Sequence, residues 1–147
     1  MEVKELRIGN IVEVNHYEYG DMFASVTSIN DVGDLCLHLL DERFTKEEYE
    51  CTMNEVAPIP ITNELLLNIG FKKKRDGYLH YSDYNDEFSI KFDLGYAFIE
   101  YANLCFNPED VTETNYGSSL EFPNTLHLHT LQNIWCLLTG KDLEIKL

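Results

Sequence analysis

Residues 58–70 read Pro-Ile-Pro-Ile-Thr-Asn-Glu-Leu-Leu-Leu-Asn-Ile-Gly, and they separate two parts of the chain that differ in pattern. Alternate prolines forbid a helix and favour an extended connector. Directly behind them Thr62 can cap a new helix, Glu64 lies in its first turn, and Gly70 can end it. We therefore predict a short helix after an extended connector, with residues 1–57 and 58–147 as two sub-regions.

The segment before this connector has the pattern of short strands. Apolar and β-branched residues dominate 6–14, 24–29 and 35–40, and turn residues separate these stretches. We predict a small curled β-sheet whose opening phrase looks like the start of an SH3-like barrel. Residues 42–50 are polar, which indicates a short helix or a loop.

The segment after Gly70 has the pattern of an antiparallel β meander. Asp76-Gly77 supplies the positive φ angles of a tight hairpin turn. The polar residues 107–119 are predicted to form a surface excursion. Further strands are expected over 88–94, 96–106 and 120–122.

A helix is predicted at the C-terminus. Its apolar stripe should pack on the meander, and Gly140 should end it. Ile134 and Leu137 widen the stripe, so either the helix is buried on two sides within one chain or its extra face makes a homodimer. The stripe consists of Leu128, Leu131, Trp135 and Leu138.

The whole chain is predicted to be one α+β domain, because 147 residues is the size of one ordinary domain. The expected order is an N-terminal SH3-like curled β-sheet, a short helix, an antiparallel β meander and a C-terminal helix packed on the sheet.

The net charge of the chain limits the classes of partner that it can bind. The chain has 26 Asp and Glu against 11 Lys and Arg, a formal net charge of −15. Such a field repels nucleic acid and anionic membranes, so a general nucleic-acid binder is disfavoured. The N-terminus shows neither a secretory signal nor a membrane span, and the four cysteines lie far apart. We expect a cytoplasmic protein with buried free thiols.

Residues 95–101, Gly-Tyr-Ala-Phe-Ile-Glu-Tyr, match the core of the RNA-recognition-motif signature, in which alternate aromatic rings stack on bases. Tyr96, Phe98 and Tyr101 are the candidate rings. The phrase that would have to be the partner strand begins at Leu6, which is too far upstream for that domain. The alternative is a central strand of an antiparallel sheet.

Residues 72–75 form a cluster of four basic side chains with Tyr78 close behind. Lys72, Lys74 and Tyr78 are candidates for a phosphate-binding edge. Strand alternation would divide the four charges between two faces, and the alternative is a solvated strand that leads into a hairpin.

His127 and His129 would lie on one face if their segment is a strand, a spacing that can chelate zinc or iron. A third ligand is missing nearby, so hydrogen-bonded structural histidines are the alternative. We find no Gly-x-Ser-x-Gly, His-Glu-x-x-His or Walker-type motif and no distinctive carboxylate pair. We therefore predict no catalytic residues, no metal and no cofactor.

Residues 56–71 and 127–143, preceded by Leu6-Arg7-Ile8-Gly9-Asn10, are similar in order and spacing to a group of small hypothetical proteins of gut bacteria and their phages. In that group a PIPLT-helix-GF phrase precedes a β meander, and a HQLQNLYFALTGEEL-like helix ends the chain. The resemblance implies a shared fold and a phage or prophage setting. It transfers no catalytic or binding residue.

Together these features predict a non-enzymatic accessory protein that binds a macromolecular partner. The partner we expect is a protein, and one variant is a basic nucleic-acid-binding host protein that this acidic chain engages by mimicking nucleic acid. The alternative is a single-stranded RNA or DNA-binding protein that uses residues 95–101.

Overall fold

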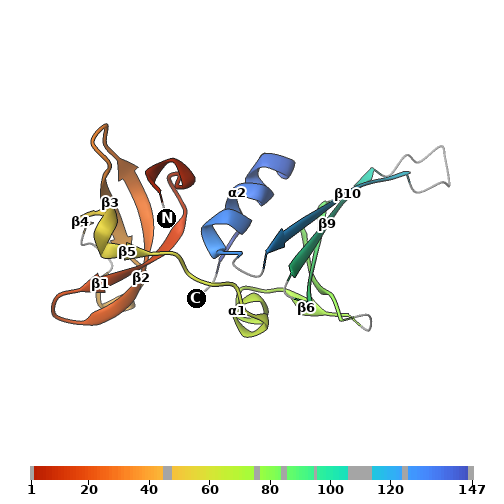
Figure 1. The fold of residues 1–147 in the computed structure, drawn as a ribbon, viewed down its shortest axis with the longest axis horizontal. Helices are drawn as coiled ribbons and strands as arrows, with labels where there is room; N and C mark the ends of the chain where they lie inside the picture. Colours follow the sequence, from red (N-terminus) through yellow and green to blue (C-terminus); the bar gives the residue numbers. More distant parts are fainter. Residues whose placement is uncertain are drawn as a thin grey trace. The chain divides into compact units, whose positions relative to one another are not determined.

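The computed structural model describes residues 2–44, 48–74, 77–83, 86–94, 96–105, 114–123 and 126–145. The chain forms two compact units, which can be followed by colour in Figure 1. Unit 1 comprises Met1–Pro60 and His127–Leu143, and unit 2 comprises Ile61–Leu126 and Glu144–Leu147. Each unit holds one antiparallel sheet and one α-helix, which confirms the predicted α+β class. No helix among the described residues is long and apolar enough to cross a membrane.

Unit 1 contains a five-stranded sheet in the order β4-β3-β2-β1-β5. Its strands are β1 (Ile11–His16), β2 (Gly20–Ile29), β3 (Asp34–Leu39), β4 (Glu48–Thr52) and β5 (Val56–Ala57). Three short 3-10 helices accompany them, η1 (Val3–Glu5), η2 (Glu42–Phe44) and η3 (Met53–Glu55). The three predicted strands of this segment correspond to β1, β2 and β3, but the first begins at Ile11 and not at Leu6.

The sheet of unit 1 is curled around an apolar core. Val12 and Val14 in β1, Ala24 in β2, and Leu35 and Leu37 in β3 are fully buried, as the two-residue period of a half-buried strand predicts. The register between β2 and β3 shifts between Val26 and Ser28. Such a bulge bends the strand and increases its twist, which helps the sheet to close over its core.

The interpretation of residues 42–50 as a short helix or a loop is correct for the 3-10 turn η2 and wrong from Glu48 onward, and residues 45–47 lie outside the described residues. The strand β4 begins at Glu48 and pairs with β3. Along β4, Glu48 and Glu50 are exposed, whereas Tyr49 is half-buried and Cys51 is buried. The alternation was present in the sequence, but the charged side chains of an edge strand hid it.

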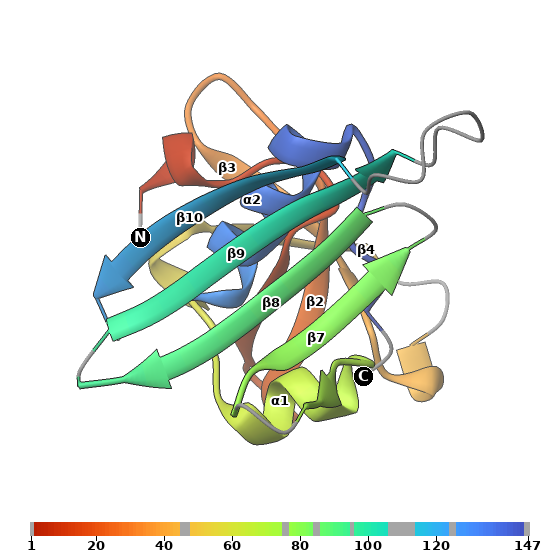
Figure 2. The same ribbon diagram turned by 90° about the vertical axis from the view of Figure 1, so that its right-hand side faces the viewer.

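Unit 2 contains a second five-stranded sheet in the order β10-β9-β8-β7-β6 (Figure 2). The strands are β6 (Lys72–Lys73), β7 (Leu79–Asp83), β8 (Asp86–Asp93), β9 (Tyr96–Cys105) and β10 (Thr114–Pro123). The helix α1 (Asn63–Asn68) precedes them, and its cap is as predicted, because Thr62 Oγ1 accepts a hydrogen bond from the Leu65 N–H at 3.1 Å. Gly70 follows it with a φ of 105°.

The strand predicted over 120–122 is much longer, because β10 runs antiparallel to β9 over all ten of its residues. Backbone pairing with β9 satisfies its hydrogen bonds even where the side chains are polar, so composition alone does not end the strand. The prediction of a surface excursion over 107–119 is therefore wrong for residues 114–119, and its remaining residues, 107–113, lie outside the described residues.

The C-terminal helix α2 (Leu128–Thr139) ends at Gly140 as predicted, with a φ of 71°. Leu128, Leu131 and Trp135 are buried. The structure groups this helix with the sheet of unit 1. The physical reason is a set of polar contacts that residue periodicity cannot show.

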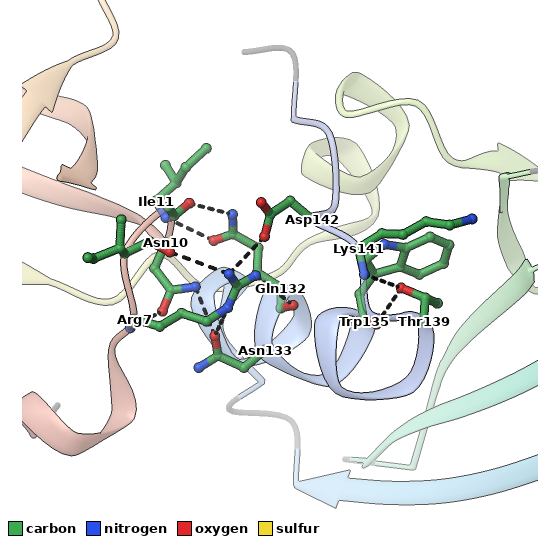
Figure 3. A network of polar contacts seen from close by, with 11 residues as sticks. Arg7, Asn10, Ile11, Gln132, Asn133, Trp135, Thr139, Lys141 and Asp142 are labelled. Atoms are coloured by element: carbon green, nitrogen blue, oxygen red, sulfur yellow. Dashed lines mark hydrogen bonds and ion pairs between the residues drawn. The ribbon is translucent and has the colours of Figure 1, made fainter.

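Gln132 joins α2 to the start of β1, as Figure 3 shows. Its Oε1 accepts a hydrogen bond from the Ile11 N–H at 2.8 Å, and its Nε2 donates to the Gly9 carbonyl at 3.1 Å. The side chain is 3% exposed. Gln132 therefore supplies a hydrogen-bond partner for the backbone N–H of Ile11, which would otherwise be buried without one.

Asn133 makes the second half of this junction (Figure 3). Its Oδ1 accepts from Arg7 Nε and from Asn10 Nδ2, each at 2.9 Å, and Nδ2 donates to the Glu5 carbonyl at 2.8 Å. Arg7 also pairs with Asp142 at 2.8 Å. Residues from the N-terminal and C-terminal phrases of the resemblance thus contact each other, and these contacts are structural.

Candidate binding surfaces

Most of the nucleic-acid candidates lie on one face of the second sheet. Cross-strand partners share a face, and the register pairs Lys72 with His80 and Lys91 with Phe98. We call this surface the polar face of unit 2. It consists of Lys72, Lys74, Tyr78, His80, Glu87, Ser89, Lys91, Asp93, Tyr96, Phe98, Glu100, Ser119 and Glu121.

Tyr101 is the exception, because it lies on the opposite face with the buried Ala97 and Ile99. Its hydroxyl donates to Asp86 Oδ1 at 2.8 Å, and its ring is 6.4 Å from that of Phe88. The grouping of Tyr96, Phe98 and Tyr101 as three stacking rings is therefore wrong. An odd spacing from Phe98 turns Tyr101 to the other side of the strand.

Two of the three lysines of the polar face lie close to carboxylates. Lys74 Nζ is 2.6 Å from Glu87 Oε1, and Lys91 Nζ is 3.6 Å from Asp93 Oδ2. The hydrogen bond from Lys74, followed by that from His80, lowers the pKa of Glu87. With three lysines and four carboxylates this face has no positive field for a phosphate backbone.

Ser89, His80 and Glu87 form a cluster that the sequence analysis missed. Two side chains contact the same atom, His80 Nδ1. Ser89 Oγ lies 2.7 Å from it, and Glu87 Oε1 lies 2.8 Å from it. A nucleophilic triad needs the hydroxyl and the carboxylate on opposite imidazole nitrogens. Ser89 is also only 6% exposed, so this arrangement does not support acyl transfer. The hairpin register, had it been known, would have placed the three together.

The two candidate metal ligands lie at the start of α2. His127 is the N-cap and His129 is in the first turn, with ring centroids 5.7 Å apart and planes within 8°. No group of three potential ligands occurs among the described residues. The rings are stacked, and the third ligand that the sequence lacked is not supplied by the described part of the fold.

We expect His129 to make stability depend on pH. Burial, and then the neighbouring His127, lowers the pKa of His129 from its ordinary 6.5. The unfolded chain therefore takes up the proton first as the pH falls below about 6.5, and the free energy of unfolding should decrease until His129 also protonates in the fold. Urea denaturation at neutral and mildly acidic pH measures this decrease. It should shrink in His129→Phe and persist in His38→Gln, and an unchanged pH dependence in His129→Phe contradicts the assignment.

A cluster of five aromatic side chains lies at one end of the core of unit 1, and the sequence analysis missed it. His16 is central, with its ring centroid 4.7 Å from Tyr17, 5.0 Å from Tyr19, 5.1 Å from Tyr49 and 6.3 Å from Phe44. We call these five residues the aromatic cluster. They come from three separate segments, and the available signal was the Tyr-x-Tyr phrase in the turn between β1 and β2.

A pocket of about 330 Å³ opens beside β3 and β4 of unit 1. Asp34, Glu50 and Glu55 supply its carboxylates, and none of the ion pairs found among the described residues includes them. The remaining lining residues are Ser28, Asn30, Leu35, Cys36, Cys51 and Thr52. The pocket is therefore anionic.

The cysteines are buried less uniformly than predicted. Cys51 is buried, and burial raises its pKa to about 11, so the thiol stays neutral. Cys36 and Cys136 are only half-buried. All three are free, and the side chain of Cys105 lies outside the described set.

No protein-family model matches the chain, and neither a curated protein nor a solved structure does. The resemblance to small proteins of gut bacteria and their phages therefore stays a prediction.

Proposed function

We propose that this chain is a non-enzymatic binding protein of the cytoplasm whose partner is a basic protein. The observation that carries the proposal is the charge of unit 1, which has 14 Asp and Glu against 5 Lys and Arg. Three of these carboxylates line the pocket beside β4. A field of this sign raises the rate of encounter with cationic surfaces and rejects anionic ones.

One form of this function is nucleic-acid mimicry, in which surface carboxylates occupy the basic groove of a nucleic-acid-binding host protein. The resemblance to phage and prophage proteins supports that setting. We also propose that the curled sheet of unit 1 is SH3-like. Its five antiparallel strands in the order β4-β3-β2-β1-β5 support this proposal. Such a scaffold leaves its loops to contact a partner.

The test is capture of host proteins on the immobilised chain at about 50 mM and about 200 mM salt. We expect basic proteins to bind at the lower concentration and to elute at the higher one, because the contacts are between exposed charges. Capture should weaken in the double variant Glu50→Gln with Glu55→Gln, since Gln keeps the cap that Glu55 gives to Thr52. The matched control is Glu100→Gln with Glu121→Gln in unit 2. Capture of no basic protein, or a complex indifferent to salt, contradicts the proposal.

A second candidate function is single-stranded nucleic-acid binding at the polar face of unit 2. The observation in its favour is that Tyr96, which is 45% exposed, and Phe98 share one face with Lys72 and Lys74. The carboxylates on the same face oppose it. Labelled mixed-sequence RNA at low salt should therefore give no anisotropy change. Binding that is lost in Tyr96→Ala with Phe98→Ala, at about 1–3 kcal/mol per stack, would favour the second function.

A further inference from the structure

We propose that the aromatic cluster of unit 1 is a docking surface for arginine side chains of the partner protein. This inference rests on the proposed function, and it names the chemical group that is recognised.

Two rings of the cluster are presented to solvent, although their partners are buried. Tyr17 is 80% exposed and Tyr19 48%, whereas His16 is 7% and Phe44 9% exposed. His16 and Phe44 are buried at the end of the core. Tyr17 and Tyr19 are not needed to cover that core, because they are largely exposed. Both tyrosine rings stack on His16, at interplanar angles of 25° and 29°. Stacked rings lose little conformational freedom on binding, which favours tyrosine as a contact residue.

The cluster already holds one guanidinium from its own chain. Arg43 Cζ lies 5.8 Å from the centroid of Tyr19 and 5.4 Å from that of Phe44. Asp41 completes the arrangement, because Arg43 Nε and Nη2 donate to its two carboxylate oxygens at 2.9 and 2.7 Å. Aromatic faces with a carboxylate beside them are the surroundings that a planar guanidinium prefers. The outer ring, Tyr17, offers the same kind of face to an arginine from outside.

The carboxylates around the aromatic cluster favour a positively charged ligand. Glu18, Glu42 and Glu48 are each next in sequence to a cluster residue or to Arg43, and all three are exposed. The ion pairs among the described residues do not involve them. Among the described residues around the cluster, three carboxylates stand against one cation, Arg43, which Asp41 already pairs, and this balance favours a basic segment over a neutral or acidic one. Arginine is preferred to lysine, since only guanidinium can also stack on a ring.

The test uses a fluorescein-labelled peptide of alternating arginine and glycine, with lysine and citrulline peptides of equal length, and the full chain at about 50 mM salt. We expect the arginine peptide to bind, the lysine peptide to bind less tightly and the neutral citrulline peptide not to bind. Tyr17→Ala should weaken arginine binding about 2- to 30-fold, and Tyr17→Phe should leave it nearly unchanged. Tyr17 is exposed enough for the variant to fold, which its melting temperature checks.

The matched control is Tyr96→Ala, an exposed tyrosine of unit 2, which should bind the arginine peptide like the unaltered chain. Equal binding of arginine and citrulline peptides overturns the inference, and so does absence of arginine binding. If Tyr17→Ala binds normally while Glu18→Gln with Glu42→Gln binds weakly, recognition is by charge alone. That result overturns the docking surface and leaves the proposed function standing, because the salt-dependent capture of basic proteins tests the function separately.

Discussion

Replacing Trp135 by Ala is expected to lower the free energy of unfolding by about 3–5 kcal/mol. Trp135 is 1% exposed, and it is the largest fully buried side chain of the described residues. Its removal both loses apolar burial and leaves a cavity that the surrounding core can fill only in part. Because whole domains are stable by about 5–15 kcal/mol, many of the molecules should unfold near body temperature. Urea denaturation followed by circular dichroism measures the loss.

Leu137 provides the control for this substitution, because it lies on the same helix but is 84% exposed. Leu137→Ala should change the free energy of unfolding by less than about 0.5 kcal/mol. Light scattering on the Trp135→Ala variant tests the homodimer alternative. A variant that melts like the unaltered chain but changes from dimer to monomer would make α2 an interface helix and refute the core assignment.

Replacing Gln132 by Ala is expected to lower the free energy of unfolding by about 1–3 kcal/mol, the cost of leaving one buried backbone group without a partner. That group is the Ile11 N–H, which donates to Gln132 Oε1 at 2.8 Å, whereas Gly9, whose carbonyl Gln132 binds at 3.1 Å, is exposed and can be hydrated. The change should also loosen the start of β1 from α2. Hydrogen exchange should therefore show faster exchange of the Ile11 amide than of amides in the middle of β2.

Gln132→Met separates hydrogen bonding from packing, because Met has a similar size but makes no strong hydrogen bond. It should destabilise the fold about as much as Ala does. Asn68→Ala, an exposed amide at the end of α1, is the control and should have little effect. If Gln132→Met is as stable as the unaltered chain, the role of Gln132 is to fill space, and its two hydrogen bonds contribute nothing to stability.

Local features of the sequence were enough to predict the two described α-helices and most of the described strands. Thr62 and Gly70 bound α1 and Gly140 ends α2, because capping and positive φ are properties of one or two residues. Apolar and β-branched stretches between turn residues located β8 and β9 to within about two residues and β1 with a start five residues too early. Strand alternation correctly divided Lys72 and Lys73 between two faces.

Tertiary contacts decided what local pattern could not. The strands β4 and β10 exist because neighbouring strands satisfy their backbone hydrogen bonds, although their own side chains are largely polar. α2 belongs to unit 1 because Gln132 and Asn133 bind the backbone near β1, and the apolar stripe of a helix does not specify which sheet it covers.

The candidate surfaces were likewise predicted in part from the sequence and decided in part by the tertiary structure. Composition determined that this chain is strongly acidic, and motif spacing determined which rings and lysines to consider. The odd spacing between Phe98 and Tyr101 already places these two rings on opposite faces of a strand, but only strand register could bring Lys74 to Glu87. Only the tertiary structure could show that His16, Phe44 and Tyr49, from three separate segments, form one cluster. Side chains that are distant in sequence become neighbours through pairing between strands, and the sequence of one segment does not determine that pairing.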